Sequence, residues 1–134
     1  MITTLAEYRQ VQAKGIEPLF GNNLNMPLRK EIQKSLFGEG NHATNNGKFY
    51  KWVWQHRPHI CEECMKPIRT YSATHISHIL TRGAHPEMAY DPRNVNILCK
   101  THHDMWEDAT RRFGMRILER NNETIDRLKK DYRL

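Results

Sequence analysis

The pattern of apolar and polar residues over the first 47 positions predicts two short helices and a loop. Residues 4–15 open with the Thr-x-x-Glu spacing of a capping box and end at a glycine. Residues 27–38 place leucine and isoleucine at i, i+4 and i+8, which is the spacing of one helical face. Residues 38–47 (GEGNHATNNG) are polar and rich in Gly and Asn, so we expect a loop and an internal boundary there.

Residues 48–59 (KFYKWVWQHRPH) mix basic and aromatic side chains in a pattern that fits both a helix and a strand. We adopt a helix that ends at Pro58, because proline disfavours helical geometry in the residue before it. The aromatic side chains either pack against the core or stack on nucleobases, and two large indoles favour the core. In the second interpretation the cations that would contact phosphates are Lys48, Lys51 and Arg57.

The rest of the chain predicts a hairpin followed by helices. We expect strands at 70–78 and 95–98 around a loop of Gly, Pro and Asp, a helix from about residue 100, and a charged, mostly helical end from residue 113. The fold class is therefore α+β, as one mostly helical small domain. Its predicted parts are a helical N-terminal extension (1–47), a core (48–112) and a basic C-terminal helix (113–134).

Composition adds a basic surface to this picture. The chain of 134 residues has a net charge of +6, a pI near 9.4 and a mean hydropathy of −0.81. A basic surface favours polyanions, of which nucleic acid is the commonest. No apolar run approaches a membrane span, and the N-terminus lacks the pattern of a secretory signal, so we expect a soluble, cytoplasmic protein with no membrane partner.

Three cysteines and a histidine have the spacing of a metal site. Cys61-x2-Cys64 is matched by Cys99-x2-His102, and two such pairs place four ligands tetrahedrally around Zn²⁺. Thiolates and imidazole suit zinc better than magnesium. The alternative, a redox pair of Cys61 and Cys64, leaves the other two residues without a role. Because residues 65–98 intervene, the zinc clamps the base of an inserted hairpin.

A second set of residues lies in that insertion and just after it. The segment reads Ser77-His78, then Asn94 five positions before Cys99, and His103 directly after His102. Over residues 58–107 this pattern resembles the HNH, or ββα-metal, nuclease family. The sequence around these residues is similar to that of phage and mobile-element members. The resemblance implies a central ββα-metal motif pinned by a structural zinc.

The resemblance also implies an activity, metal-dependent hydrolysis of DNA phosphodiester bonds. His78 is then the general base, and His103 binds a single catalytic divalent ion, Mg²⁺ or Mn²⁺. Asn94 either orients the loop after His78 through its amide or ligates the ion. The implied partner is DNA, contacted mainly through its phosphate backbone, by a monomer that nicks or a homodimer that cuts both strands.

The chain departs from the family pattern at Ser77, where many relatives carry a metal-binding Asp or His. Glu107 lies four residues after His103 on the same helical side, so we rank it above His75 as the replacement ligand. Ser77 keeps open the alternative of a catalytically decayed, zinc-stabilised nucleic-acid-binding module.

For further basic residues of the sequence, contact with DNA phosphates and simple exposure to solvent are equally good interpretations. Asp91, by contrast, is predicted to cap a turn before Pro92 and not to bind metal. Besides the three cations of residues 48–59, the candidates for DNA contact are Arg82, Arg111 and Arg112.

Overall fold

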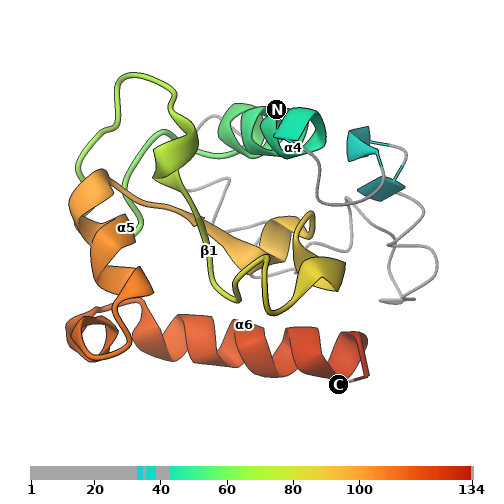
Figure 1. Cartoon of the computed structure of the whole chain (residues 1–134). Coiled ribbons are helices and arrows are strands. Elements are labelled where there is room, and N and C mark those ends of the chain that lie inside the picture. Colours follow the sequence, from blue (N-terminus) through green and yellow to red (C-terminus); the bar gives the residue numbers. More distant parts are fainter. Residues whose placement is uncertain (1–32, 35, 39–42, 134) are drawn as a thin grey trace.

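The computed structural model describes residues 33, 34, 36–38 and 43–133, and they form a small, mostly helical α+β domain. The predicted fold class is thus confirmed at this level. A two-stranded antiparallel sheet lies between helices, with α4 on one side of it, α6 on the other and α5 at one end (Figure 1). The elements are α4 (Ala43–His56), β1 (Ile76–His78), β2 (Val95–Ile97), α5 (Lys100–Glu107) and α6 (Leu118–Asp131). Within the described ranges, no helix combines the length and apolar character needed to cross a membrane.

The register of the sheet sorts its side chains between two layers. Ser77 pairs with Asn96, and His78 pairs with Val95. Asn96 accepts a hydrogen bond of 2.8 Å from the amide of Asn121, so its face of the sheet is directed at α6. His78 contacts the ring of Phe49 on α4, with the ring centroids 6.1 Å apart. Because side chains alternate along a strand, Ser77 and His78 lie on opposite faces.

The predicted helix over residues 27–38 is described in part. Residues 33, 34, 36 and 37 are helical, and the chain leaves the helix at Gly38, whose backbone N–H bonds to Lys34 O at 2.9 Å. The φ of Gly38 is +90°, and a Cβ there would lie 2.8 Å from the side chain of Asn45, so glycine is required at this position. The predicted helix over residues 4–15 lies outside the described residues.

The loop predicted over residues 38–47 is wrong in its second half, because α4 already begins at Ala43. Asn46 is buried in this first part of the helix and accepts a 2.6 Å hydrogen bond from the hydroxyl of Tyr90. Phe49 and Val53 follow on the buried face and are fully inaccessible to solvent. Packing of this face stabilises the helix against the weak helix propensity of Asn and Gly. The predicted helix, and its core-facing orientation, are confirmed.

Two further boundaries differ from the prediction. Strand β1 begins at Ile76 and not at residue 70, because Ser72 accepts a hydrogen bond from Thr74 N at 3.3 Å and starts a 3-10 turn, η1 (Ala73–His75). Such local side-chain bonds compete with strand formation. The C-terminal helix begins at Leu118 and not near residue 113, since a second 3-10 turn, η4 (Arg111–Gly114), precedes it.

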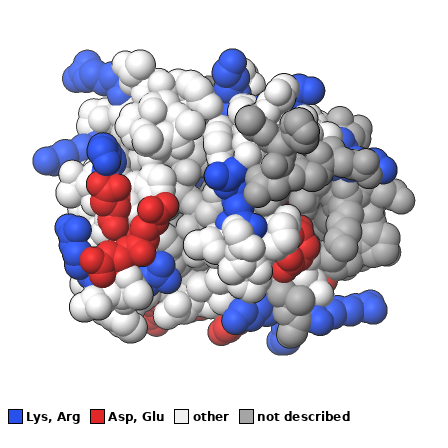
Figure 2. All heavy atoms as spheres, viewed as in Figure 1, with Lys and Arg blue, Asp and Glu red and all other residues white. Residues whose placement is uncertain are grey.

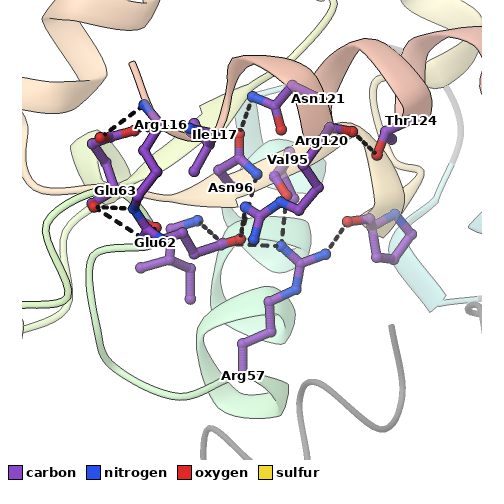
Figure 3. Close-up of polar contacts among 12 residues, drawn as sticks. Arg57, Glu62, Glu63, Val95, Asn96, Arg116, Ile117, Arg120, Asn121 and Thr124 are labelled. Carbon is purple, nitrogen blue, oxygen red and sulfur yellow. Dashed lines mark hydrogen bonds and ion pairs between the residues drawn. The ribbon is translucent and has the colours of Figure 1, made fainter. Parts of the chain in front are cut away.

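The knuckle between Cys61 and Cys64 is fastened to the beginning of α6 (Figure 3). The carboxylate of Glu63 accepts hydrogen bonds of 3.0 Å from the backbone N–H groups of Arg116 and Ile117. These N–H groups lie at a helix N-terminus, where a negative charge is favourable. Arg116 in turn donates to the backbone carbonyl of Glu62 at 2.7 Å. The Cys61–Cys64 knuckle therefore positions the C-terminal helix.

Arg57 is buried and serves this same junction, which corrects the expectation that it contacts phosphates. Its guanidinium donates to Val95 O at 2.6 Å and to Pro92 O, and it lies 3.8 Å from the buried carboxylate of Glu62 (Figure 3). Arg120 donates to the other oxygen of Glu62 at 2.7 Å. Burial of a carboxylate demands such partners, so Arg57 is committed to the interior.

Candidate functional site

Cys61, Cys64, Cys99 and His102 converge and form a possible zinc-binding site. Their ligand atoms all lie within 4.8 Å of one another. Nδ1 of His102 is 3.1 Å from the sulfur of Cys99 and 3.7 Å from that of Cys61. Tetrahedral zinc, with ligands at its usual bond lengths, separates a sulfur from a nitrogen by about 3.5 Å. The donor set and its spacing therefore fit zinc, as the sequence predicted, and a redox pair would leave the approach of Cys99 and His102 unexplained.

The backbone around the cluster favours thiolates, although burial opposes them. Burial raises the pKa of the Cys61 thiol to about 11, against backbone N–H groups of Cys64, Cys99 and Glu63 that lower it. Burial also raises the pKa of Cys64, but the backbone N–H of Lys66 and the neighbouring thiols outweigh it, and the pKa falls below its usual value. Backbone N–H groups of the knuckle thus face the sulfurs. A bound cation would supply the positive charge needed to stabilise the buried Cys61 thiolate.

His78 ends β1 with its imidazole held by a backbone carbonyl. Nε2 donates to Ala89 O at 2.8 Å, which leaves Nδ1 as the nitrogen with the lone pair. Burial lowers the pKa of His78 to about 4, against the bond to Ala89, and the charges of Arg82 and His103 lower it further. His78 is therefore neutral at pH 7, with Nδ1 able to accept a proton.

Asn94 lies fully buried beside the segment that follows His78. Its Oδ1 accepts from Leu80 N at 2.8 Å, and its Nδ2 donates to Leu80 O at 2.9 Å and to Met88 O at 3.3 Å. The one amide therefore fastens Leu80, two residues after His78, to the start of β2. Both polar atoms of the Asn94 side chain take part in these bonds and the residue is fully buried, which suits an orienting role.

His103 and Glu107 face one another on α5, four residues apart. Nδ1 of His103 donates to Thr74 O, and Nε2 lies 2.9 Å from Oε1 of Glu107. Two ligands at right angles around a magnesium ion, each at the usual bond length, lie about 3 Å apart. The side chain of His103 is 17% exposed and that of Glu107 is 65% exposed, so the pair opens to solvent. The bond to Thr74 fixes the ring as outer partners of metal-binding histidines do.

Ser77 does not join this pair, which corrects its inclusion among the candidate metal ligands. Its side chain is completely buried, on the face of the sheet opposite His78. Its Oγ has no hydrogen-bond partner within the part of the chain that the structure describes. A hydroxyl sealed from solvent beneath the sheet cannot share an ion with the exposed carboxylate of Glu107.

The remaining candidates for DNA contact differ in how far they are free to do so. Lys48, Lys51 and Arg111 are exposed. Arg82 is half-buried, and its charge acts on both His78 and Tyr50. Arg112 is committed to Trp106: its guanidinium lies 4.3 Å from the ring centroid, and its Nε donates to Trp106 O at 2.8 Å. This structural use of Arg112 corrects its assignment to phosphate contact.

Two features of the site escaped the sequence. The carbonyls of Thr74 and Ala89 orient the two histidines, and a backbone carbonyl leaves no signal in residue type. Tyr50 lies beside His78, with ring centroids 6.0 Å apart in an edge arrangement. The mixed pattern of residues 48–59 gave Tyr50 no distinct role, and its place in α4 puts it next to His78. Asp91 caps the turn before Pro92 as predicted, by accepting from Arg93 N at 2.9 Å.

Comparisons of this chain with models of protein families, with curated protein sequences and with solved structures found no match. The site therefore rests on its own geometry.

Proposed function

We propose that the chain is a metal-dependent DNA endonuclease with HNH-type chemistry. In this proposal β1, β2 and α5 make up the ββα-metal motif, and the Cys3His cluster holds a structural zinc. The observation that carries the proposal is the state of His78. Its Nε2 is tied to Ala89 O, so its Nδ1 is a free acceptor, and the charges of His103 and Glu107 are near enough to shift its pKa.

The proposed reaction uses His78 as the general base. A water molecule gives a proton to Nδ1 as its oxygen bonds to phosphorus, and the phosphorus–oxygen bond to the leaving sugar breaks. With a pKa of about 4, His78 is available in its neutral form throughout the physiological range. A phosphate brought beside the ring raises this pKa, because a negative charge favours the imidazolium. Asn94 keeps the ring in place through its bonds to Leu80.

His103 and Glu107 are the residues that would hold the catalytic ion, Mg²⁺ or Mn²⁺. Bound there, such an ion stabilises the charge that develops on the phosphate and on the leaving oxygen. An imidazole with a carboxylate suits these ions, whereas the thiol-rich cluster suits zinc. Exposed acids gather at this end of the molecule, since α5 and the residue after it carry Asp104, Glu107 and Asp108 (Figure 2).

DNA is proposed as the substrate because of the charge of the protein. The net charge of +6 favours a polyanion, and Arg82 acts electrostatically on His78, as a residue that contacts the scissile phosphate would. Lys48, Lys51 and Arg111 are the exposed cations proposed for the phosphates on either side. Affinity is then expected to fall steeply with salt.

A second function, a zinc-stabilised module that binds nucleic acid without cutting it, is favoured by one observation. Position 77, which carries an acidic or histidine ligand in many similar nucleases, is a buried serine here. The ion would then depend on His103 and Glu107 alone among the described side chains, with water or phosphate as further ligands.

A plasmid assay separates the two functions. Supercoiled plasmid is incubated with the zinc-loaded protein and Mg²⁺ or Mn²⁺, and the parent is compared with His78→Ala. We expect cleavage by the parent and a loss of about 10²- to 10⁴-fold in His78→Ala, which is the usual contribution of a general base. His59→Ala is the matched control, because this histidine is exposed, stacks on Trp54 and is not among the residues proposed for the reaction. Equal DNA retention by all three proteins without cleavage would establish the binding module instead.

A further inference from the structure

Phe113 lies on the surface in a way that its chemistry does not favour. Its side chain is 73% exposed, against 44% for Leu36, the other large hydrophobic residue found exposed in the described part of the chain. A phenyl ring on the surface forfeits the stabilisation that burial would give.

The turn that carries Phe113 is nevertheless firmly built. It is η4, and Asp108 closes it from the end of α5. Oδ1 of Asp108 accepts from Thr110 N at 2.9 Å and from Arg111 N at 3.0 Å, and its carbonyl accepts from Arg112 N at 3.0 Å. Because three backbone N–H groups are fixed, the phenyl ring projects from a defined position and not from a flexible tip.

The same turn is connected to the candidate base through buried contacts. Arg112 lies over the ring of Trp106 and donates to its carbonyl. Trp106 is buried, and its indole N–H donates to Ile79 O at 3.3 Å, directly after His78 in the chain. The contacts run from η4 through Arg112 and Trp106 to Ile79, the residue after His78, so the turn that carries Phe113 keeps a fixed place relative to the site.

A cation accompanies the ring. Arg111 is exposed, its guanidinium has no ion pair or hydrogen bond within the described residues, and its charge acts on the exposed carboxylate of Asp108. An exposed aromatic ring and an exposed cation in the same turn, two residues apart, match a nucleotide, which offers a base to stack on and a phosphate to pair with. A protein partner would need a wider apolar patch, whereas Phe113 is isolated among charged neighbours.

We propose that η4 is a base-stacking element, in which Phe113 stacks on an unpaired or extruded nucleobase and Arg111 contacts the adjoining phosphate. The proposal takes its partner class from the proposed function, and it assigns the substrate: nucleic acid with at least one unstacked base near the scissile bond. Such a preference for single-stranded, gapped or branched sites would come from Phe113 and not from the hydrolytic residues.

The test measures binding without cleavage. Zinc-loaded proteins in a His78→Ala background, without Mg²⁺ or Mn²⁺, are titrated into fluorescein-labelled oligonucleotides: a single strand, a gapped duplex and a perfect duplex. For the first two, Phe113→Ala should weaken binding about tenfold, the usual order for one stacked base. Phe113→Trp should retain the affinity, and Leu36→Ala, the matched exposed hydrophobic, should change nothing. Arg111→Ala should lower the salt slope by about one unit, whereas Phe113→Ala should leave the slope unchanged.

A base analogue adds a direct readout. 2-Aminopurine placed at the unpaired position should lose fluorescence on binding to the parent and to Phe113→Trp, but not to Phe113→Ala. Equal affinity and equal quenching for Phe113→Ala would overturn the proposal. So would a change in sedimentation of the protein alone with unaltered DNA binding, which would make Phe113 a contact between copies of the chain. The plasmid assay tests the proposed nuclease activity independently. If the parent protein binds through Phe113 but never cleaves, the base-stacking proposal stands and the nuclease proposal is wrong.

Discussion

His102 and His103 are neighbours in the chain, yet His102 lies in the Cys3His cluster and His103 in the site proposed for catalysis. Nδ1 of His102 lies among three thiols, while Nε2 of His103 faces the carboxylate of Glu107. Consecutive residues of a helix point about 100° apart, so α5 presents one histidine to each side. A single short helix can therefore keep a structural cluster and a proposed catalytic pair apart by rotation alone.

The two sites also differ in closure. The Cys3His cluster supplies four protein ligands, with Cys61 fully buried, which is the form of a structural metal site. In the proposed catalytic site, His103 and Glu107 would supply two ligands, and the pair opens to solvent, so water or a phosphate could complete the coordination. If this division holds, damage to the first site should affect folding and damage to the second should affect only metal-dependent activity.

The largest effect is expected from Cys61→Ser. Structural zinc sites contribute about 10 kcal/mol or more to folding in small domains, and the cluster also positions α6 through Glu62 and Glu63. We expect loss of bound zinc and of cooperative thermal unfolding, measured by elemental analysis and circular dichroism. His103→Ala is the matched control on the same helix and should keep one zinc per chain and a normal melt. If His103→Ala also loses zinc and unfolds, α5 does not separate two sites.

Ser77→Asp tests which face of the sheet belongs to the site. Ser77 lies buried on the α6 side, beside Asn96 and opposite His78. An aspartate there buries a charge and should cost about 3 kcal/mol or more, as uncompensated buried charges do. Ser77→Ala should stay within about 1 kcal/mol of the parent, because Oγ has no hydrogen-bond partner to lose among the residues that the structure describes. Urea denaturation measures both, and a stable Ser77→Asp with tighter Mn²⁺ binding would place the residue at the ion.

What the sequence predicted well is local in the chain. The two x2 knuckles, the short strand before Cys99, the helix from Lys100 and the turn at Asp91 each follow from residues within a few positions of one another. The burial of Ser77 was also within reach, since strand alternation already set it on the face opposite His78. The family pattern, in contrast, predicts a metal ligand at this position from the residue type alone.

The rest could not be predicted because it depends on contacts between distant segments. Arg57 is basic and follows an aromatic helix, and only the approach of Glu62 and β2 makes it a buried residue. Glu63 caps α6 from 54 residues away, and Asn46 is held in a helix by Tyr90. In each case a tertiary partner overrides what the local sequence favours.

The stability of the domain should depend on pH, because the folded chain keeps His78 neutral. This effect does not require a bound metal ion. Its pKa falls from the ordinary 6.5 to about 4 in the folded chain. Between these values the unfolded chain binds the extra proton and the folded chain does not, so stability rises with pH and is lost as pH falls from about 6.5 toward 4. The contribution is at most about 3 kcal/mol.

The zinc ligands also take up protons in acid, so the effect of His78 is read as a difference. The free energy of unfolding of the parent and of His78→Asn is measured in urea between pH 5 and pH 7.5, and both proteins carry the same cluster. The parent should lose more stability on acidification than the variant does. Parallel curves would mean that the ring of His78 is not desolvated.

The smallest effect is expected from Glu107→Ala, which tests the proposed catalytic ion site at His103 and Glu107. Removal of one of two ligands should raise the Mn²⁺ concentration needed for half-maximal cleavage by at least about tenfold. Zinc content and thermal melt should not change, because Glu107 is 65% exposed and lies outside the Cys3His cluster. Asp104→Ala is the matched control: it is another exposed acid of α5, but its carboxylate pairs with Lys100 at 3.0 Å. If the two variants respond alike to Mn²⁺, the general acidity of α5 attracts the ion, and His103 is left without a protein partner at the second site.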